Sequence, residues 1–123
     1  PRARVLGWAD TGSDRMLALT GTVDAARLAL RRAGLDARDM DLFEINEGFA
    51  AMALHFIDEM AVDAERVNVN GGAIAIGHAM GATGAALVSV LLDELEWRQQ
   101  RLGCIAICGA AGVASAMVVE RLD

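Results

Sequence analysis

Lysine is absent from this chain of 123 residues, and all eleven of its basic residues are arginine. The absence excludes a catalytic Schiff-base lysine. Basic residues are also outnumbered by seventeen acidic ones, and the formal net charge of −6 argues against a nucleic-acid-binding surface. No uninterrupted apolar run approaches the roughly eighteen residues that a membrane span needs. We therefore expect neither nucleic acid nor a membrane as a partner.

Cysteine is scarce as well, with two residues, Cys104 and Cys108, four positions apart in an apolar run. Two such positions on one strand face are too far apart for easy disulfide geometry. No second Cys/His cluster completes a zinc site, so we expect no metal and a reducing, cytoplasmic setting. No signal-peptide pattern opens the chain, and its first residue is Pro1 instead of Met. We therefore expect a processed chain or an excised piece of a longer one.

Apolar residues are plentiful, at 54% of a chain long enough to bury the core of one domain. Their periodicity predicts an α/β domain in which helices pack against a mixed five-stranded sheet. Helices are expected from an N-cap at Thr22 to the C′ glycine Gly34, after Gly48, and over about residues 82–99. In the second, the apolar residues Phe49, Met52, Ala53, Phe56, Ile57 and Met60 are expected to form one buried stripe. The expected strands are 4–8, 42–45, 67–69, 102–108 and 115–119, and the fourth has the continuous apolar run of a strand covered on both faces.

The most unusual stretch is residues 68–86 (NVNGGAIAIGHAMGATGAA), which holds five of the chain's 13 glycines. Such backbone turns tightly and lets another group approach closely. His78 lies at its centre, ahead of a predicted helix N-terminus that favours negative charge. The stretch is not a P-loop, because His78-Ala79 stands where Lys-Ser/Thr is needed, and Ala79 also removes the first glycine of a dinucleotide fingerprint. The alternative is a plain small-residue loop whose histidine satisfies a neighbouring carbonyl.

Three polar residues share a similar position in this predicted topology. Asn46 follows a strand and precedes a helix, His78 ends the glycine loop before a helix, and Cys108 ends a strand before a small-residue turn. Because ligands gather at the carboxyl ends of strands in layered α/β folds, we expect the three to meet in one pocket. A histidine close to Cys108 would lower the pKa of its thiol. By contrast, we expect Cys104 to be an inert core thiol and His55 a solvated surface residue.

These residues lie in three longer motifs: IxNEGFAA (45–51), NVNGGAIAIGHAMGATG (68–84) and CGAAGVASAMVVE (108–120). In order and spacing they resemble the three C-terminal motifs of the thiolases, the acetyl-CoA acetyltransferases and 3-ketoacyl-CoA thiolases. The likeness covers essentially the whole chain. It implies that residues 1–123 are a thiolase C-terminal domain. The N-terminal half, which in the family carries the nucleophilic cysteine and most coenzyme A contacts, is absent.

The resemblance also implies roles for four residues. Asn46 would hold a water that helps to bind the thioester oxygen, and His78 would donate to the same oxyanion and activate the nucleophilic cysteine. Cys108 would be the acid/base at the α-carbon of acetyl-CoA, and the amide of Ala110 would contribute to a second oxyanion hole. A coenzyme A thioester would be the substrate, with no further cofactor. The implied partners are the N-terminal half and further copies in a homo-oligomer.

Three departures from the family motifs stand out. Ala79 replaces the proline of Gly-His-Pro, Gly48 replaces the alanine of Asn-Glu-Ala-Phe, and alanines at 110, 111 and 114 replace glycines. An alanine amide in the last motif can donate in the same way only if φ is negative there.

The resulting leading hypothesis is half of an enzyme for thiolytic cleavage of 3-ketoacyl-CoA or Claisen condensation of acetyl-CoA. The alternative is a non-catalytic thiolase-like module that binds a partner protein. A free-standing nucleotide-binding domain is a third possibility, but both phosphate-loop signatures are missing. The apolar content of 54%, together with a fold whose halves normally pack on one another and on other subunits, predicts a large exposed apolar face on the isolated chain.

Overall fold

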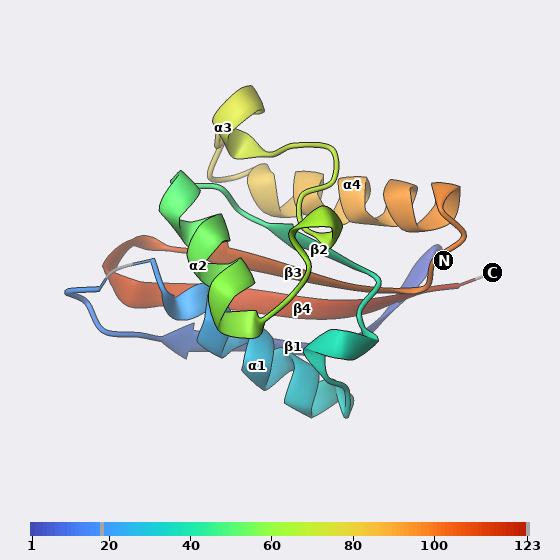
Figure 1. Ribbon diagram of the computed structural model, residues 1–123, viewed down its shortest axis with the longest axis horizontal. Helices are drawn as coiled ribbons and strands as arrows, with labels where there is room; N and C mark the ends of the chain where they lie inside the picture. The colour runs from blue at the N-terminus through green and yellow to red at the C-terminus, as the bar shows by residue number, and fades with distance from the viewer. Residues whose placement is uncertain (18, 123) are drawn as a thin grey trace.

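A computed structural model describes residues 1–17 and 19–122, which form one mixed sheet with helices on both faces (Figure 1). The strands are β1 (Ala3–Gly12), β2 (Leu42–Ile45), β3 (Leu102–Cys108) and β4 (Val113–Arg121). The helices are α1 (Gly21–Ala33), α2 (Ala50–Met60), α3 (Ala73–Ile76) and α4 (Thr83–Trp97), with short 3-10 turns η1 (Ala37–Asp39), η2 (Ala64–Arg66) and η3 (Ala110–Gly112).

The strand order is β1-β4-β3-β2, in which β4 pairs antiparallel with both β1 and β3, while β2 and β3 are parallel. Side chains alternate between two cores, as the period of two along a strand requires. On β3, Cys104 and Ala106 face the core beneath α1 and α2, whereas Ile105 faces the core beneath α4. The prediction that β3 is covered on both faces is confirmed.

The predicted number of strands is wrong: the described residues form four, not five. Val67 and Val69, expected in a short strand, make only isolated bridges to Phe43 and Gly71. Asn68 between them has a φ of 49°, in the left-handed region, which interrupts extended backbone. The first strand is longer than expected, because β4 pairs with it along its length to Gly12.

The helix boundaries follow the sequence signals most closely in α1. Gly34 takes the left-handed C′ conformation with a φ of 72°, and its N–H bonds the carbonyls of Leu30 and Arg31, as predicted. The start differs, since Thr20 is at the N-cap position and Thr22 lies inside the helix, fully buried. In α2, Met52 and Phe56 are buried as expected, but Phe49, assigned to the same stripe, is 65% exposed just ahead of the helix.

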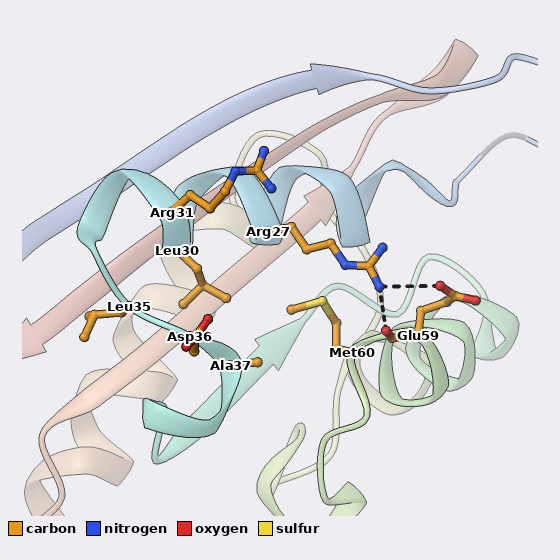
Figure 2. Close-up of a pocket in the computed structure, with 8 residues that line it drawn as sticks. All are labelled: Arg27, Leu30, Arg31, Leu35, Asp36, Ala37, Glu59 and Met60. Carbon is orange, nitrogen blue, oxygen red and sulfur yellow. Dashed lines mark hydrogen bonds and ion pairs between the residues drawn. The ribbon is translucent and has the colours of Figure 1, made fainter.

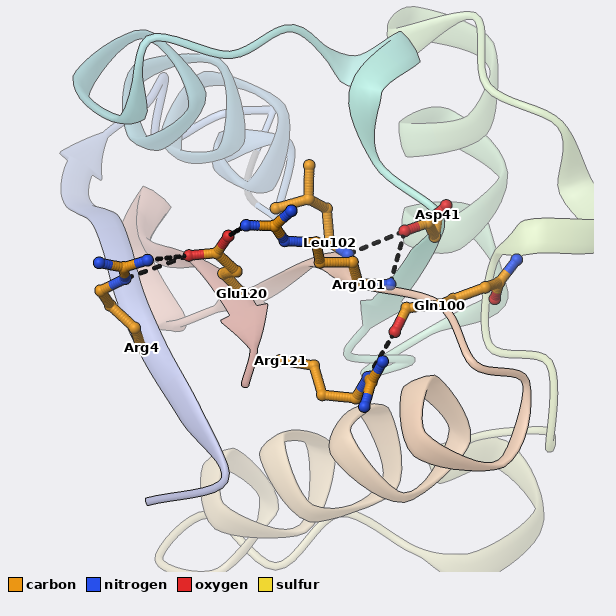
Figure 3. Close-up of polar contacts among 7 residues, drawn as sticks. All are labelled: Arg4, Asp41, Gln100, Arg101, Leu102, Glu120 and Arg121. Atoms are coloured by element: carbon orange, nitrogen blue, oxygen red, sulfur yellow. Dashed lines mark hydrogen bonds and ion pairs between the residues drawn. The ribbon is translucent and has the colours of Figure 1, made fainter. Parts of the chain in front are cut away.

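One end of the sheet is closed by polar contacts (Figure 3). The Glu120 carboxylate pairs with Arg4 (Nη2–Oε2, 2.6 Å) and with Arg101. These pairs join the start of β1 to the end of β4 and to the residue that precedes β3. The Asp41 carboxylate accepts from the backbone N–H groups of Arg101 (2.9 Å) and Leu102 (2.8 Å). These contacts align the start of β2 with the start of β3, so their carboxyl ends emerge together at the opposite end of the sheet.

Within residues 1–17 and 19–122, no helix combines the length and the apolar character that crossing a membrane requires.

Candidate active site

Asn46 and Cys108 are brought together at the open end of the sheet. Asn46 continues β2, its N–H donating to the carbonyl of Ala106 at 2.9 Å, and Cys108 is the last residue of β3. Gly48 lies beside both: a Cβ added there would sit 3.6 Å from Cys108 Sγ and 3.8 Å from Asn46 Nδ2. The two parallel strands thus place a thiol and an amide next to each other, as their positions in the sequence predicted.

The Asn46 side chain is fully buried, yet neither its Nδ2 nor its Oδ1 has a hydrogen-bond partner of normal geometry among the described residues. The Asn46 amide lies beside the Cys108 thiol and helps to lower its pKa without forming a hydrogen bond of normal geometry. A buried amide left unpaired costs about 1–3 kcal/mol, so native proteins keep one mainly where something else uses it.

The Cys108 pKa differs from the expectation. Burial raises it, and the opposing contributions, from a backbone N–H and from Asn46, do not reverse the shift. His78 is not among its causes, so the expected lowering by a histidine is not seen. The Sγ donates to Met52 Sδ at 3.3 Å, a contact that the sequence pattern missed because Met52 fitted the core stripe of α2.

Cys104 behaves as predicted for a core thiol. It is fully buried between the strands, and desolvation raises its pKa to about 12. His55, expected on a solvated face, is partly buried on α2.

His78 lies on an exposed loop between α3 and α4, and its Nδ1 is 2.8 Å from the Oγ1 of Thr83 in the first turn of α4. Thr83 Oγ1 also donates to the carbonyl of Ala79 at 3.0 Å. This contact fixes the orientation of the ring and leaves Nε2 as the nitrogen that is available to hydrogen-bond another group. In the described chain no hydrogen bond joins His78 to Asn46 or Cys108, so the convergence of all three stays a prediction.

Ala110 begins the η3 turn that follows Cys108, and it is exposed. Its φ is not positive, whereas Ala111 has a φ of 60° and Gly112 a φ of 84°. No hydrogen bond joins the Ala110 N–H to another described residue, whereas its carbonyl accepts from the N–H of Val113. An alanine amide can replace the glycine amide of the family motif only where φ is negative. Ala110 meets this condition and Ala111 does not.

A small cavity of about 100 Å³ lies beneath the histidine-bearing loop, lined by Glu44, Gly72, Gly77 and Thr83 among others. Glu44 is 2% exposed, and its pKa is raised to about 7, mainly by burial and then by the charges of Glu47 and Glu94. Nothing in the sequence pattern marked this acid, because it occupies a position inside a predicted strand.

A pocket of about 340 Å³ lies elsewhere, between α1, η1 and α2 (Figure 2). It holds none of the predicted site residues. The Arg27 guanidinium is already occupied by Glu59, donating to its carbonyl at 2.7 Å and lying 3.6 Å from its carboxylate, and Arg31 points away from Asp36. We assign no site there. Among the described residues, no group of three or more His, Cys, Asp or Glu side chains is placed to hold a metal ion.

Over 99% of its length, the chain superimposes on the crystal structure of the Bacillus anthracis acetyl-CoA acetyltransferase with a TM-score of 0.95 and 37% identity, covering 31% of that protein. It is 44% identical to the acetyl-CoA acetyltransferase of Shinella zoogloeoides over 99% of this chain and 31% of that protein. It is 43% identical to the steroid 3-ketoacyl-CoA thiolase FadA6 of Mycobacterium tuberculosis over 99% and 30%, respectively.

The fold and these likenesses define a thiolase-like α/β domain. The family model for the thiolase C-terminal domain matches residues 1–121, and the chain belongs to that family. It spans about 31% of the length of the curated relatives that it matches.

Proposed function

We propose that this chain is the C-terminal half of a thiolase that transfers acyl groups between coenzyme A thioesters. The reaction would be thiolytic cleavage of a 3-ketoacyl-CoA or Claisen condensation of acetyl-CoA. The observation that carries the proposal is that the Cys108 thiol and the Asn46 amide, which has no hydrogen-bond partner, lie side by side at the carboxyl ends of two parallel strands. The names of its relatives, acetyl-CoA acetyltransferases and a 3-ketoacyl-CoA thiolase, support the same class.

The chemistry divides among four groups. Cys108, as a thiolate, takes a proton from the α-carbon of acetyl-CoA, and the electron pair moves onto the thioester oxygen. Asn46, through a water, and His78 donate to that enolate oxygen, while the Ala110 amide stabilises the oxyanion formed at the partner half's nucleophilic cysteine. Because burial raises the Cys108 pKa, the thiol form prevails near neutral pH in the separate chain. That form returns a proton to carbon in the reverse direction.

The N-terminal half would cover a groove of about 390 Å³ on the α4 side of the sheet. There α4 packs on β2 and β3 and leaves apolar side chains of β1 and β4 open, including Trp8, which is 59% exposed, and Met117. Near the histidine, Ile76 and Met80 are 81% and 89% exposed. Such apolar exposure fits a surface that a partner buries. Coenzyme A thioester is the substrate, no other cofactor is needed, and the assembled protein is a cytoplasmic homo-oligomer.

The two cysteines provide the test. With the chain combined with a thiolase N-terminal half, Cys108→Ser should slow exchange of acetyl-CoA methyl protons with deuterated solvent by at least about 10²-fold, the contribution of general acid–base catalysis. Acyl transfer to the partner's nucleophile should stay measurable. Cys104→Ser, the matched control on the same strand, should keep exchange near the wild-type rate.

Full exchange in Cys108→Ser would remove Cys108 from the mechanism. An assembled wild-type protein that binds its partner half but shows neither exchange nor acyl transfer would favour the non-catalytic module instead.

A further inference from the structure

Glu47, the residue after Asn46, reaches across to the glycine-rich stretch. Its Oε1 accepts from the Nδ2 of Asn68 at 2.9 Å, and its Oε2 accepts from the backbone N–H of Ile74 at 3.1 Å. One carboxylate therefore joins the turn that carries Asn46 to two points of the segment that leads to His78.

The neighbouring residues are shaped for this contact. A Cβ on Gly72 would lie 2.5 Å from the Glu47 carboxyl carbon, so any larger residue at 72 would push the carboxylate away. Asn68 is itself held on the last residue of β2, its Oδ1 accepting from the Ile45 N–H at 2.7 Å and its Nδ2 donating to the Ile45 carbonyl at 2.9 Å. The link from β2 through Asn68 to Glu47 is thus anchored at its base in the sheet.

The contact also serves as the cap of α3. This helix has four residues, and Gly72 at its N-cap has no side chain to bond the free N–H groups of the first turn. The Glu47 carboxylate takes over that function from a distant part of the sequence, where a negative charge is also favoured. Helix α3 ends directly at Gly77 and His78.

The rest of the loop is attached only locally. We call residues 73–82 the histidine loop; its residues 74–82 are all exposed. Across residues 1–17 and 19–122, the bond from Ile74 to Glu47 is the one hydrogen bond that joins this loop to any residue outside 72–97. The position of His78 relative to the sheet depends on that bond at one end and on α4 at the other.

We propose that Glu47 is a positioning residue that sets His78 in register with Asn46 and Cys108. The inference rests on the proposed function, because it assigns Glu47 to the same site. Glu47 does not touch the reacting atoms; it acts through the histidine loop. Since a misplacement of about 1 Å in a catalytic group can cost about 10²-fold in rate, removal of the tie should weaken catalysis more than substrate binding.

The first test compares Glu47→Ala, Glu47→Gln and the exposed control Glu65→Ala in the chain combined with an N-terminal thiolase half. Glu47→Ala should lower kcat about 10- to 100-fold with KM changed less than about threefold. Glu47→Gln keeps one carbonyl oxygen as an acceptor and should lie between Glu47→Ala and wild type. Glu65→Ala should match wild type. A kcat for Glu47→Ala within twofold of wild type would overturn the inference.

A double-variant cycle separates positioning from general destabilisation. If Glu47 acts through His78, Glu47→Ala should lower kcat little further in a His78→Ala background. Fully additive losses would contradict the inference.

Amide hydrogen exchange supplies a readout that needs no activity. In Glu47→Ala, residues 73–82 should exchange at least about tenfold faster while α1 and β3 keep their protection. If the wild-type assembly shows no turnover, the proposed function fails, and this exchange result alone decides the inference: unchanged exchange in the histidine loop would refute it.

Discussion

At one end of the sheet Glu120, with a side chain 8% exposed, is paired with both Arg4 and Arg101, and Asp41 accepts two backbone N–H groups. At the other end Asn46 is buried with both polar atoms unpartnered, beside a thiol whose pKa is raised. The carboxylates of Glu120 and Asp41 follow the general rule that buried polar groups are hydrogen-bonded, although Oε1 of Gln100 beside them has no partner among the described residues. Asn46 departs from the rule with both of its polar atoms. Under the proposed function, this difference separates residues that hold the fold from residues that serve the reaction.

The largest effect is expected from Asn46→Ala. Loss of an oxyanion donor costs about 10²–10³-fold in kcat, whereas removal of an unpaired buried amide relieves a desolvation penalty that offsets the cavity left by the smaller side chain. Turnover of the assembled protein should therefore fall by that factor, while the free energy of unfolding of the chain should change by less than about 1 kcal/mol. Steady-state kinetics and urea unfolding measure the two. A large loss of stability with little loss of turnover would place Asn46 with the structural end of the sheet.

Glu44→Gln should change how stability depends on pH. The Glu44 pKa is raised from 4.5 to about 7 in the folded chain, so the folded state binds a proton that the unfolded state has released. Unfolding free energy from this group therefore falls as pH rises from 4.5 to about 7 and stays lower above it, by at most about 3 kcal/mol. Glu44→Gln should be more stable than wild type at pH 8 and not at pH 4.

Thermal melts across that range check the sign. Glu65→Gln, an exposed acid on η2, serves as the control and should follow the wild-type profile. If wild type and Glu44→Gln change in stability equally between pH 5 and pH 7, the Glu44 pKa is not raised in the folded chain and the prediction is wrong.

Glu120→Gln tests the closed end, with the opposite pH dependence. The two arginines, Arg4 first, hold the Glu120 pKa below its ordinary value. Its contribution to stability is therefore present above pH 4.5 and is lost as pH falls through the lower folded pKa. We expect the variant to have a Tm a few degrees below that of wild type at pH 7 and the same Tm as wild type near pH 2. Its kcat should be unchanged. Equal effects at both pH values would show that charge pairing is not the cause.

The sequence predicted best what local signals determine. The glycine at 34 marked the end of α1, and the continuous apolar run of β3 marked a strand covered on both faces. The pairing of Asn46 with Cys108 was also predictable, because each follows one of two strands whose carboxyl ends share an edge.

What the sequence missed depends on contacts between distant segments. Glu47 caps a helix that begins 26 positions later, and no local pattern marks such a pair. In the sequence, Thr83 is one of several small residues at the start of a helix, yet in the structure its hydroxyl contacts and orients the His78 ring. The prediction of a fifth strand was wrong because Asn68 has a left-handed backbone conformation that interrupts the extended chain. Its side chain instead hydrogen-bonds the backbone of β2.

The smallest effect concerns the turn after Cys108, where Ala110 and Ala111 both replace glycines of the family motif. Ala111 has a φ of 60°, which costs an L-residue about 1 kcal/mol or more, and Ala110 lies outside the left-handed region. Ala111→Gly should therefore stabilise the chain by about 0.5–1 kcal/mol, after allowance for the greater freedom of glycine in the unfolded state. Ala110→Gly, with no strain to relieve, should be neutral or destabilising by a similar amount. Urea unfolding of the two neighbouring variants gives a direct comparison, and changes of the same sign would show that the strain at Ala111 is already relieved. The turn after Cys108 would then carry no strain, in contrast to the unpaired polar atoms of Asn46 at the same end of the sheet.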